Sequence, residues 1–200
     1  MFEYTDFMRF ILASASPQRK SLLQGLGMAF DVVPSSLDES TCAEKDPSKR
    51  AAVLARLKAE DIFQQYNDCV VLGCDTLVVA ADGTLLEKPR DAAEAERMLR
   101  LQSGKVSTVH SALCLIDPSS QVEGISSSRV HFKKLSDQEI AWWISTGQWK
   151  DRSGGFQIDG LGQLMIENLG GDWTSVVGLP VYLLGELMGK VGVRIDVVPL

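Results

Sequence analysis

The sequence predicts an α/β protein built on a mixed β-sheet. Short apolar runs alternate with segments that carry helix-capping residues, which is the pattern of strands and helices packed in layers. The alternation is irregular, and Asp82-Gly83 marks a tight turn between two apolar runs, so a purely parallel sheet is not expected. The 200 residues are 45% hydrophobic and 23% charged, which is typical of a globular chain with a sizeable core.

The first elements follow from local signals. The apolar run 10–13 predicts a buried strand. Ser16 followed by Pro17 predicts a helix start, because serine caps the first turn and proline fits the first helical position. This helix should end at Gly25 or Gly27. The same signals then predict a strand over 30–33, a helix from Asp46-Pro47 to Ile62, one or two strands over 69–79, a hairpin of 77–80 with 84–87, and a helix from Asp91 to about Gly104.

The second half continues the alternation. Strands are predicted over 106–116 and 125–132. Ser136 and Glu139 form a capping-box pattern, which predicts a helix that Gly147 ends. A glycine-rich segment predicts turns, and Gly178-Leu179-Pro180 predicts the start of a last helix, with Pro180 near its first position. The alternating residues 191–198 predict an extra strand.

Composition excludes several classes of function. The net charge is −6, from 26 acidic and 20 basic residues, so no broad surface for nucleic acid or anionic membrane is expected. No apolar stretch reaches the length of a membrane span, and the N-terminus lacks the pattern of a signal peptide. Four cysteines without a CxxC pair and two histidines do not form a zinc motif, and they favour a cytosolic chain with reduced thiols.

Residues 14–19 are a candidate anion site. A helix N-terminus attracts anions through its free N–H groups and its dipole. Ser14 and Ser16 add hydroxyl donors, and Arg19 in the first turn can bind a phosphate with two N–H groups. A plain N-cap at Ser16 gives the same pattern, so this segment alone does not establish a binding site.

Asp75 is a candidate catalytic residue. It stands between Leu72-Gly73-Cys74 and Leu77-Val78-Val79, where an unpaired carboxylate is costly to bury. It fits a Mg²⁺ ligand or a base that acts on water. A solvated turn at the end of a strand is the other interpretation.

The remaining charged candidates are individually ambiguous. Lys88 could bind a phosphate, but a solvated loop over 87–91 has the same composition. Glu39 and Lys58 read as surface charges by default. Asp159 lies with Asp151, Arg152 and Gln157 among glycines that would let a ligand approach the backbone. Met98, Met165, Trp142 and Trp143 are predicted core residues, and neither His110 nor His131 has a motif that would make Ser111 a hydrolase nucleophile.

Taken in order, these segments resemble the Maf family, nucleoside triphosphate pyrophosphatases once named for septum formation. The resemblance covers about residues 10–189. Each motif is weak alone, and the ordered set is specific. Its motifs are Ile11-Leu12-Ala13-Ser14-Ala15-Ser16-Pro17-Gln18-Arg19, Asp38-Glu39, Leu54-Ala55-Arg56-Leu57-Lys58-Ala59, Leu72-Gly73-Cys74-Asp75-Thr76, Glu87-Lys88-Pro89-Arg90-Asp91-Ala92, Met98-Leu99, Ser103-Gly104-Lys105, Gly154-Gly155-Phe156, Gly160-Leu161-Gly162 and Val177-Gly178-Leu179-Pro180.

The resemblance implies a single Maf-like domain over 1–200, with two lobes around an elongated mixed sheet, flanking helices, and the nucleotide in a cleft between the lobes. It implies hydrolysis of the α–β phosphate bond of a nucleoside triphosphate, with Mg²⁺ or Mn²⁺, in a cytoplasmic protein that dimerises in many members. The implied roles are phosphate binding by Ser14, Ser16 and Arg19, charge neutralisation by Lys58 and Lys88, and work on the metal and water by Glu39 and Asp75. Asp75 is the preferred base; Asp75 as a metal ligand only, with Glu39 orienting the water, stays open.

The resemblance also bears on the substrate. Asp75-Thr76 and Leu86-Glu87-Lys88-Pro89 look like the branch that acts on dTTP, UTP and modified pyrimidine nucleotides. Gln18 and Asp159 depart from that branch, which usually has arginine and glutamine there, and an acid at 159 is typical of the 7-methyl-GTP branch. The alternatives are therefore a 7-methyl-GTP pyrophosphatase, a triphosphatase of the inosine triphosphate type, and a nucleotide-binding regulator of cell division without significant catalysis.

Overall fold

The computed structural model describes residues 8–192. Residues 193–198 of the strand expected at the C-terminus lie outside this range. In chain order the elements are β1 (Phe10–Leu12), α1 (Pro17–Gly25), β2 (Asp31–Val32), η1 (Glu39–Thr41), α2 (Pro47–Phe63), β3 (Val70–Val79), β4 (Leu85–Leu86), α3 (Ala92–Gln102), β5 (Val106–Ile116), β6 (Gln121–Phe132), α4 (Asp137–Thr146), η2 (Ser153–Gly155), η3 (Gly160–Met165), β7 (Ile166–Gly170), α5 (Trp173–Val177) and α6 (Val181–Lys190).

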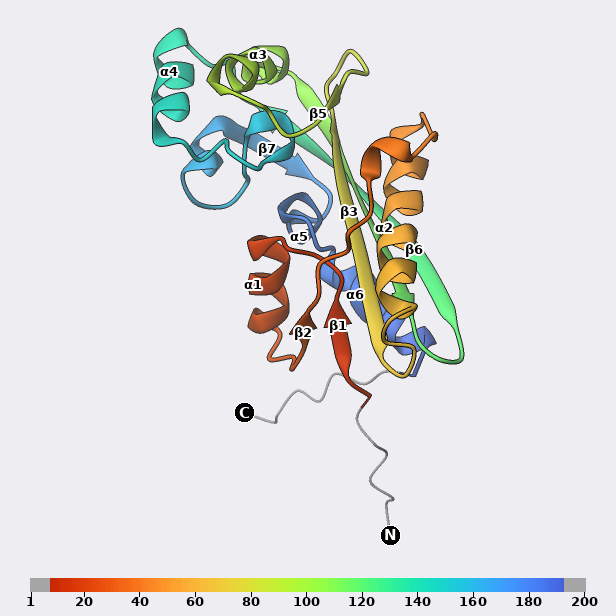
Figure 1. Cartoon of the computed structure of the whole chain (residues 1–200). Coiled ribbons are helices and arrows are strands. Elements are labelled where there is room, and N and C mark those ends of the chain that lie inside the picture. The colour runs from red at the N-terminus through yellow and green to blue at the C-terminus, as the bar shows by residue number, and fades with distance from the viewer. Residues whose placement is uncertain (1–7, 193–200) are drawn as a thin grey trace.

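The described strands form one mixed sheet, as the sequence predicts. Its order is β2-β1-β3-β5-β6-β7, and β4 pairs with β3. β1 runs parallel to both of its neighbours, whereas the remaining pairs are antiparallel. The long strands β3, β5 and β6 give the sheet its elongated shape (Figure 1).

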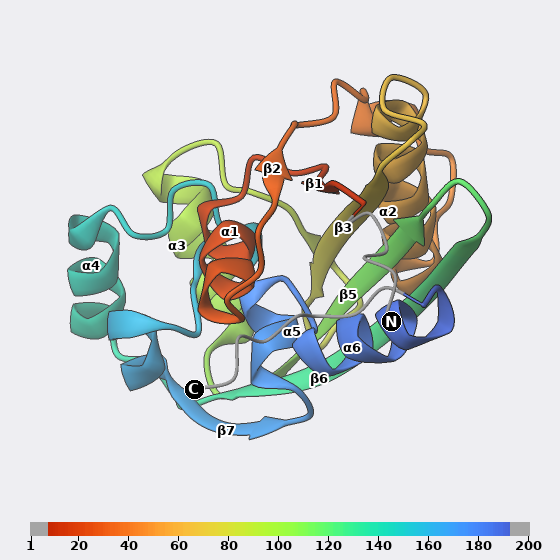
Figure 2. The same ribbon diagram turned by 90° about the horizontal axis from the view of Figure 1, so that it is seen from below.

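Buried apolar side chains divide the protein into two lobes that share these long strands. In the upper lobe of Figure 1, α3 and α4 pack with β4 and β7 around Trp143 and Phe132. In the lower lobe, α1 and α6 cover one face of the sheet and α2 covers the other, as Figure 2 shows from below. None of the helices in residues 8–192 has the length and hydrophobicity to span a bilayer.

The helix starts predicted from local sequence are confirmed. Each capping side chain accepts a hydrogen bond from the backbone N–H three residues on: Ser16 from Arg19, Asp46 from Lys49, Asp91 from Glu94, and Ser136 from Glu139. The hairpin is also confirmed, because β3 and β4 pair antiparallel around the Asp82-Gly83 turn. Residues 70–79 form a single strand.

Two details differ from the sequence prediction. β6 begins at Gln121 rather than at 125, because its polar first residues pair with the end of β5 across the Asp117 turn. Trp142 is 39% exposed, because α4 turns Ile140 and Trp143 toward the core and neighbouring helix positions face different directions.

Candidate active site

The chemistry-bearing residues gather at a break in one edge of the sheet. β1 pairs with β3 only as far as Leu72, and β4 begins to pair at Val78 on the same edge. Between these points, residues 73–77 of β3 have no neighbouring strand on that edge within the described chain. Successive strand residues point to opposite faces, so Asp75 faces α2 and Thr76 faces α1.

On the α2 face, one ammonium group joins two carboxylates. Lys58 Nζ lies 2.6 Å from Asp75 Oδ1 and 2.8 Å from Glu39 Oε1. Lys58 and Asp75 have 12% and 6% of their side chains exposed, whereas Glu39 is 52% exposed. Lys58 is therefore not a solvated surface charge, whereas Glu39 is an exposed residue that forms an ion pair with it.

Two opposing effects act on the carboxyl group of Asp75. Burial raises the pKa of its carboxyl above the usual range, and the Lys58 ammonium only partly offsets this effect. Its second oxygen, Oδ2, is buried and has no hydrogen-bond partner among residues 8–192. The interpretation of Asp75 as a solvated turn residue is excluded, since it lies within β3.

Glu39 is held in place from α2 as well. It opens the short helix η1, which Asp38 caps. The Arg50 guanidinium on α2 donates hydrogen bonds to the carbonyl oxygens of Cys42 at 2.6 Å and Glu39 at 3.2 Å. The same helix therefore presents Lys58 and positions the loop that carries Glu39.

On the α1 face, Arg19 is the centre of a second polar group. Its Nη1 donates to Ser14 Oγ at 2.9 Å, its Nη2 to Thr76 Oγ1 at 3.2 Å, and its Nε to the Gly178 carbonyl at 2.9 Å. Ser14 Oγ also accepts from the backbone N–H of Ser16 at 3.3 Å. The predicted cluster of Ser14, Ser16 and Arg19 thus forms at the N-terminus of α1.

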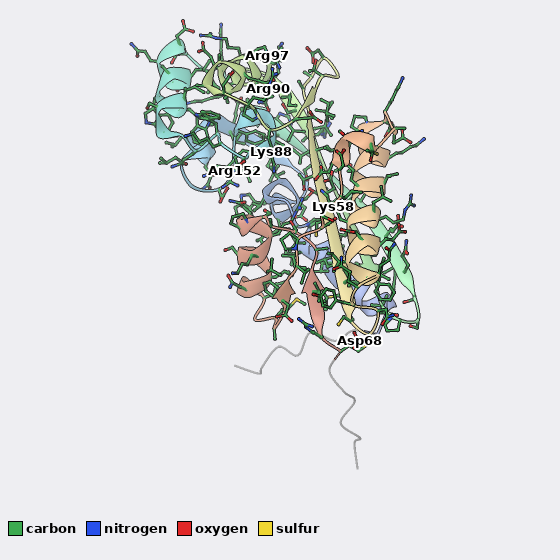
Figure 3. The ribbon with its side chains drawn as sticks, viewed as in Figure 1. Lys58, Asp68, Lys88, Arg90, Arg97 and Arg152 are labelled. Atoms are coloured by element: carbon green, nitrogen blue, oxygen red, sulfur yellow. The ribbon has the colours of Figure 1, made fainter. Side chains whose placement is uncertain are left out.

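Lys88 and Asp159 belong to the other lobe. Within residues 8–192, no hydrogen bond or ion pair joins either of them to the residues at the sheet break. Figure 3 places Lys88 and Arg152 on the side of the upper lobe nearer to Lys58. The Gly154 N–H donates to the Glu87 carbonyl at 3.1 Å, which ties the Lys88 loop to η2.

Two members of the α1-face group have no assigned role in the sequence analysis. Thr76 served there only to distinguish the family branches, and Gly178 only as part of a motif. Tertiary pairing alone brings them to Arg19, over separations of 57 and 159 residues. Within residues 8–192 the Ser111 hydroxyl has no histidine partner: it contacts the Ser175 carbonyl and the Thr76 hydroxyl, while His110 Nδ1 bonds to Ser127 Oγ at 2.8 Å.

The carboxylates at the sheet break fit a divalent cation. Mg²⁺ takes oxygen ligands and is commonly held by one or two carboxylates together with waters and substrate phosphates. Asp75 Oδ2 has no hydrogen-bond partner in the described part of the chain, and Glu39 and Asp75 both contact the Lys58 ammonium group. No cluster of three or more His, Cys, Asp or Glu side chains suited to a metal occurs in residues 8–192, so phosphate or water oxygens would have to complete the site.

Comparison with known proteins identifies relatives of this chain. The family described as Maf-like protein matches residues 9–191. A dTTP/UTP pyrophosphatase of Treponema denticola is 43% identical, with 92% of this chain and 98% of that protein covered. A dTTP/UTP pyrophosphatase of Deinococcus radiodurans is 41% identical, with 92% of this chain and 94% of that protein covered.

A solved structure shares the fold at low sequence identity. A HAM1 protein from Coxiella burnetii superposes with a TM-score of 0.50 at 11% identity, covering 92% of this chain and 99% of that one. The family model spans nearly the whole described chain and the relatives exceed 40% identity. The chain belongs to the Maf family.

Proposed function

We propose that this chain is a nucleoside triphosphate pyrophosphatase that hydrolyses dTTP, UTP or modified pyrimidine triphosphates to the monophosphate and pyrophosphate. The observation that carries the proposal is the pairing of Lys58 with Asp75 and Glu39 at the break in the sheet, beside the Arg19 group. The names of the relatives, dTTP/UTP pyrophosphatase, support the same reaction.

Binding of the triphosphate falls to groups on both faces of β3. Arg19 and the N-terminus of α1 present N–H donors, and two acceptor bonds leave the Ser14 hydroxyl proton available to a phosphate oxygen. Lys58 neutralises charge on the other face, and Lys88 does so from the upper lobe. Phosphoryl transfer depends mainly on such positioning and charge stabilisation.

Asp75 acts as the general base on the attacking water. Its raised pKa makes the carboxylate a better proton acceptor than an exposed aspartate, and the adjacent Lys58 ammonium favours the ionised form. In the alternative division of labour, Asp75 only ligates the metal and Glu39 orients the water. In both schemes Lys58 stays close to the reacting phosphates and stabilises the departing pyrophosphate.

Mg²⁺ or Mn²⁺ would be held by Asp75 and Glu39, and when bound it would neutralise phosphate charge and polarise the bond that breaks. Lys58 forms ion pairs with both of these carboxylates, so the cation would bind carboxylates that also contact the Lys58 ammonium. The chain's own contribution is to keep two acidic groups and one basic group within one hydrogen-bonded cluster.

Which nucleobase the site accepts is the finer part of the proposal. Thr76 and Glu87 favour the pyrimidine branch, as do the names of the relatives. Asp159 favours 7-methyl-GTP, which is the second candidate substrate. Asp159 is half-buried at the start of η3, where it can contact a base that enters between the lobes.

Further features of the proposal concern the whole chain. We propose a single domain over 1–200, supported by strands that run through both lobes. The four free cysteines and the proposed nucleotide substrate support a cytoplasmic localisation. A homodimer and a role in septum formation remain predictions from the family resemblance.

The test is pyrophosphate release from dTTP, UTP, CTP, 7-methyl-GTP and ITP with Mg²⁺, for the wild type and for Asp75→Asn. We expect the wild type to act on dTTP or UTP. In Asp75→Asn this activity should fall by about a thousandfold or more, because the variant loses both the catalytic base and a charged member of the cluster. Asp117→Asn is the matched control, because Asp117 is an equally buried acid at the β5–β6 hairpin.

Each other result has a definite meaning. Activity confined to 7-methyl-GTP would contradict the pyrimidine assignment and support the reading of Asp159. Undiminished activity in Asp75→Asn would refute the assigned role of Asp75. Nucleotide binding without turnover on every substrate would favour the regulator over the enzyme.

A further inference from the structure

Arg19 is held by three protein acceptors on its three nitrogens. Nε donates to the Gly178 carbonyl, Nη1 to Ser14 Oγ and Nη2 to Thr76 Oγ1. A guanidinium group has five N–H bonds, so two remain, one on each terminal nitrogen. The orientation of these two groups depends on whether the three acceptors are themselves fixed.

The hydroxyl of Thr76 is fixed by a chain of hydrogen bonds that can run in only one direction. Ser111 Oγ lies 2.6 Å from the Ser175 carbonyl oxygen, which cannot donate, so Ser111 uses its single proton there. Ser111 Oγ lies 2.8 Å from Thr76 Oγ1 and can therefore only accept from it. With its proton committed to Ser111, Thr76 presents a lone pair to Arg19.

The burial of this chain makes its direction stable. Ser111 and Ser175 are fully buried, so no solvent competes for the Ser111 hydroxyl. Among the described residues 8–192, the only other acceptor near the Thr76 hydroxyl is the Gly178 carbonyl at 3.4 Å, a distance longer by 0.6 Å than that from Thr76 Oγ1 to Ser111 Oγ. Buried polar groups in such a chain of hydrogen bonds polarise one another, which favours a single arrangement.

We infer that Thr76 is a positioning residue, which acts through Arg19 and is itself oriented by Ser111 and the Ser175 carbonyl. Resting on the proposed function, this inference assigns the three residues to triphosphate affinity. They keep the two free N–H groups of Arg19 directed at the substrate phosphates without touching the substrate. The sequence gives no sign of this, since Arg19, Thr76, Ser111 and Ser175 lie on α1, β3, β5 and α5.

The test is a double-mutant cycle between Thr76 and Arg19. Thr76→Val keeps the shape of the side chain but removes the acceptor. We expect kcat/KM for dTTP to fall about tenfold, mainly through KM, because a hydrogen bond to a charged group is lost. In an Arg19→Ala background, the same Thr76→Val change should alter kcat/KM by less than about twofold, since its target is gone.

Two further variants keep the inference testable if Thr76→Val folds poorly. Thr76→Ser retains the hydroxyl and should stay within about twofold of the wild-type KM. Ser111→Ala should raise KM by only about threefold, because the Thr76 proton can turn to the Gly178 carbonyl and leave a lone pair for Arg19. Circular dichroism and unfolding midpoints show which variants are folded.

The outcomes separate this inference from the proposed function. Equal losses from Thr76→Val in both backgrounds would overturn it, because Thr76 would then act independently of Arg19. An unchanged KM in folded Thr76→Val would overturn it as well. Absence of pyrophosphate release from the wild type would instead refute the proposed function, and the cycle would then be read from equilibrium binding of dTTP, with the same expected ratios.

Discussion

The carboxylate of Asp75 lies within β3, largely out of water, with the Lys58 ammonium as its ion-pair partner. Because burial raises its pKa, the folded state binds this proton more tightly than the unfolded state does. Its contribution to the free energy of unfolding is therefore full below the unfolded pKa and is lost as pH rises through the folded pKa. Above its folded pKa, the ionised Asp75 destabilises the folded state.

Asp75→Asn is therefore expected to be more stable than the wild type at pH 8, although it is inactive. The gain should shrink as pH falls through the raised pKa toward 3.8, the ordinary value for aspartate. Urea unfolding midpoints at pH 8, 6 and 4.5 measure this trend. A variant that is less stable than the wild type at pH 8 would mean that the Lys58 ion pair outweighs the cost of burial.

The pKa of Asp117 is shifted in the opposite direction from that of Asp75, so its effect on stability has the opposite pH dependence. Burial raises the pKa of its carboxyl, but hydrogen bonds from Ser119 and Ser120 outweigh this and hold the pKa below the usual range. Its contribution to stability is therefore present above the unfolded pKa and is lost as pH falls through the folded pKa. Asp117→Asn should accordingly be less stable than the wild type at pH 8.

At the scale of elements, the position of Lys58 depends on how closely α2 approaches β3. A Cβ atom at Gly73 would lie 2.1 Å from the Ala55 carbonyl oxygen and 2.8 Å from Ala59 Cβ. Only glycine at this point of β3 allows the helix to lie against the strand. The contact between Lys58 on α2 and Asp75 on β3 follows from that approach.

Gly73→Ala should therefore destabilise the protein by about 1–3 kcal/mol and lower pyrophosphate release, because α2 must move away from β3. Gly185→Ala is the matched control on α6, where nothing lies within 4 Å of an added Cβ. It should stabilise the protein by about 0.5–1 kcal/mol, since alanine favours a helix interior over glycine. Thermal unfolding with an activity assay compares the two, and equal stability of both variants would contradict the close-approach argument.

At the scale of the whole molecule, the proposed substrate contacts both lobes. Ser14 and Arg19 lie at the start of α1 in the lower lobe. Figure 3 shows Lys58 in the lower lobe and Lys88 in the upper one. A ligand held by both lobes stabilises the folded protein by mass action, by about 2.7 kcal/mol at a hundredfold excess over Kd. For a chain of this size that corresponds to a rise in Tm of about 5–10 °C.

We expect this rise with Mg²⁺ and a dTTP analogue that has a methylene group between the α- and β-phosphates. Lys88→Gln should reduce the rise while leaving the Tm of the free protein unchanged, because Lys88 is an exposed surface residue. Differential scanning fluorimetry at matched ligand concentrations makes the comparison. A full rise in Lys88→Gln would place the binding energy in the lower lobe alone.

The elements and the site differ in how far the sequence predicts them. Caps such as Ser16 and Asp46 were predictable, because a cap and the N–H that it accepts from lie three residues apart. The order of strands was not predicted, and the start of β6 was misplaced because its polar residues give no strand signal. Trp142 was wrongly assigned to the core, because a local pattern does not decide which of two neighbouring helix residues faces inward.

The sequence by itself determined the local elements and, through the ordered motifs, the family and the residues proposed for its site. Only the tertiary structure decided that Lys58 bridges Asp75 and Glu39, and that Thr76 and Ser111 support Arg19. The physical reason is range. Caps and turns depend on backbone groups a few residues apart, whereas the site depends on where β1 stops and β4 begins along β3, and that pairing joins segments far apart in the chain.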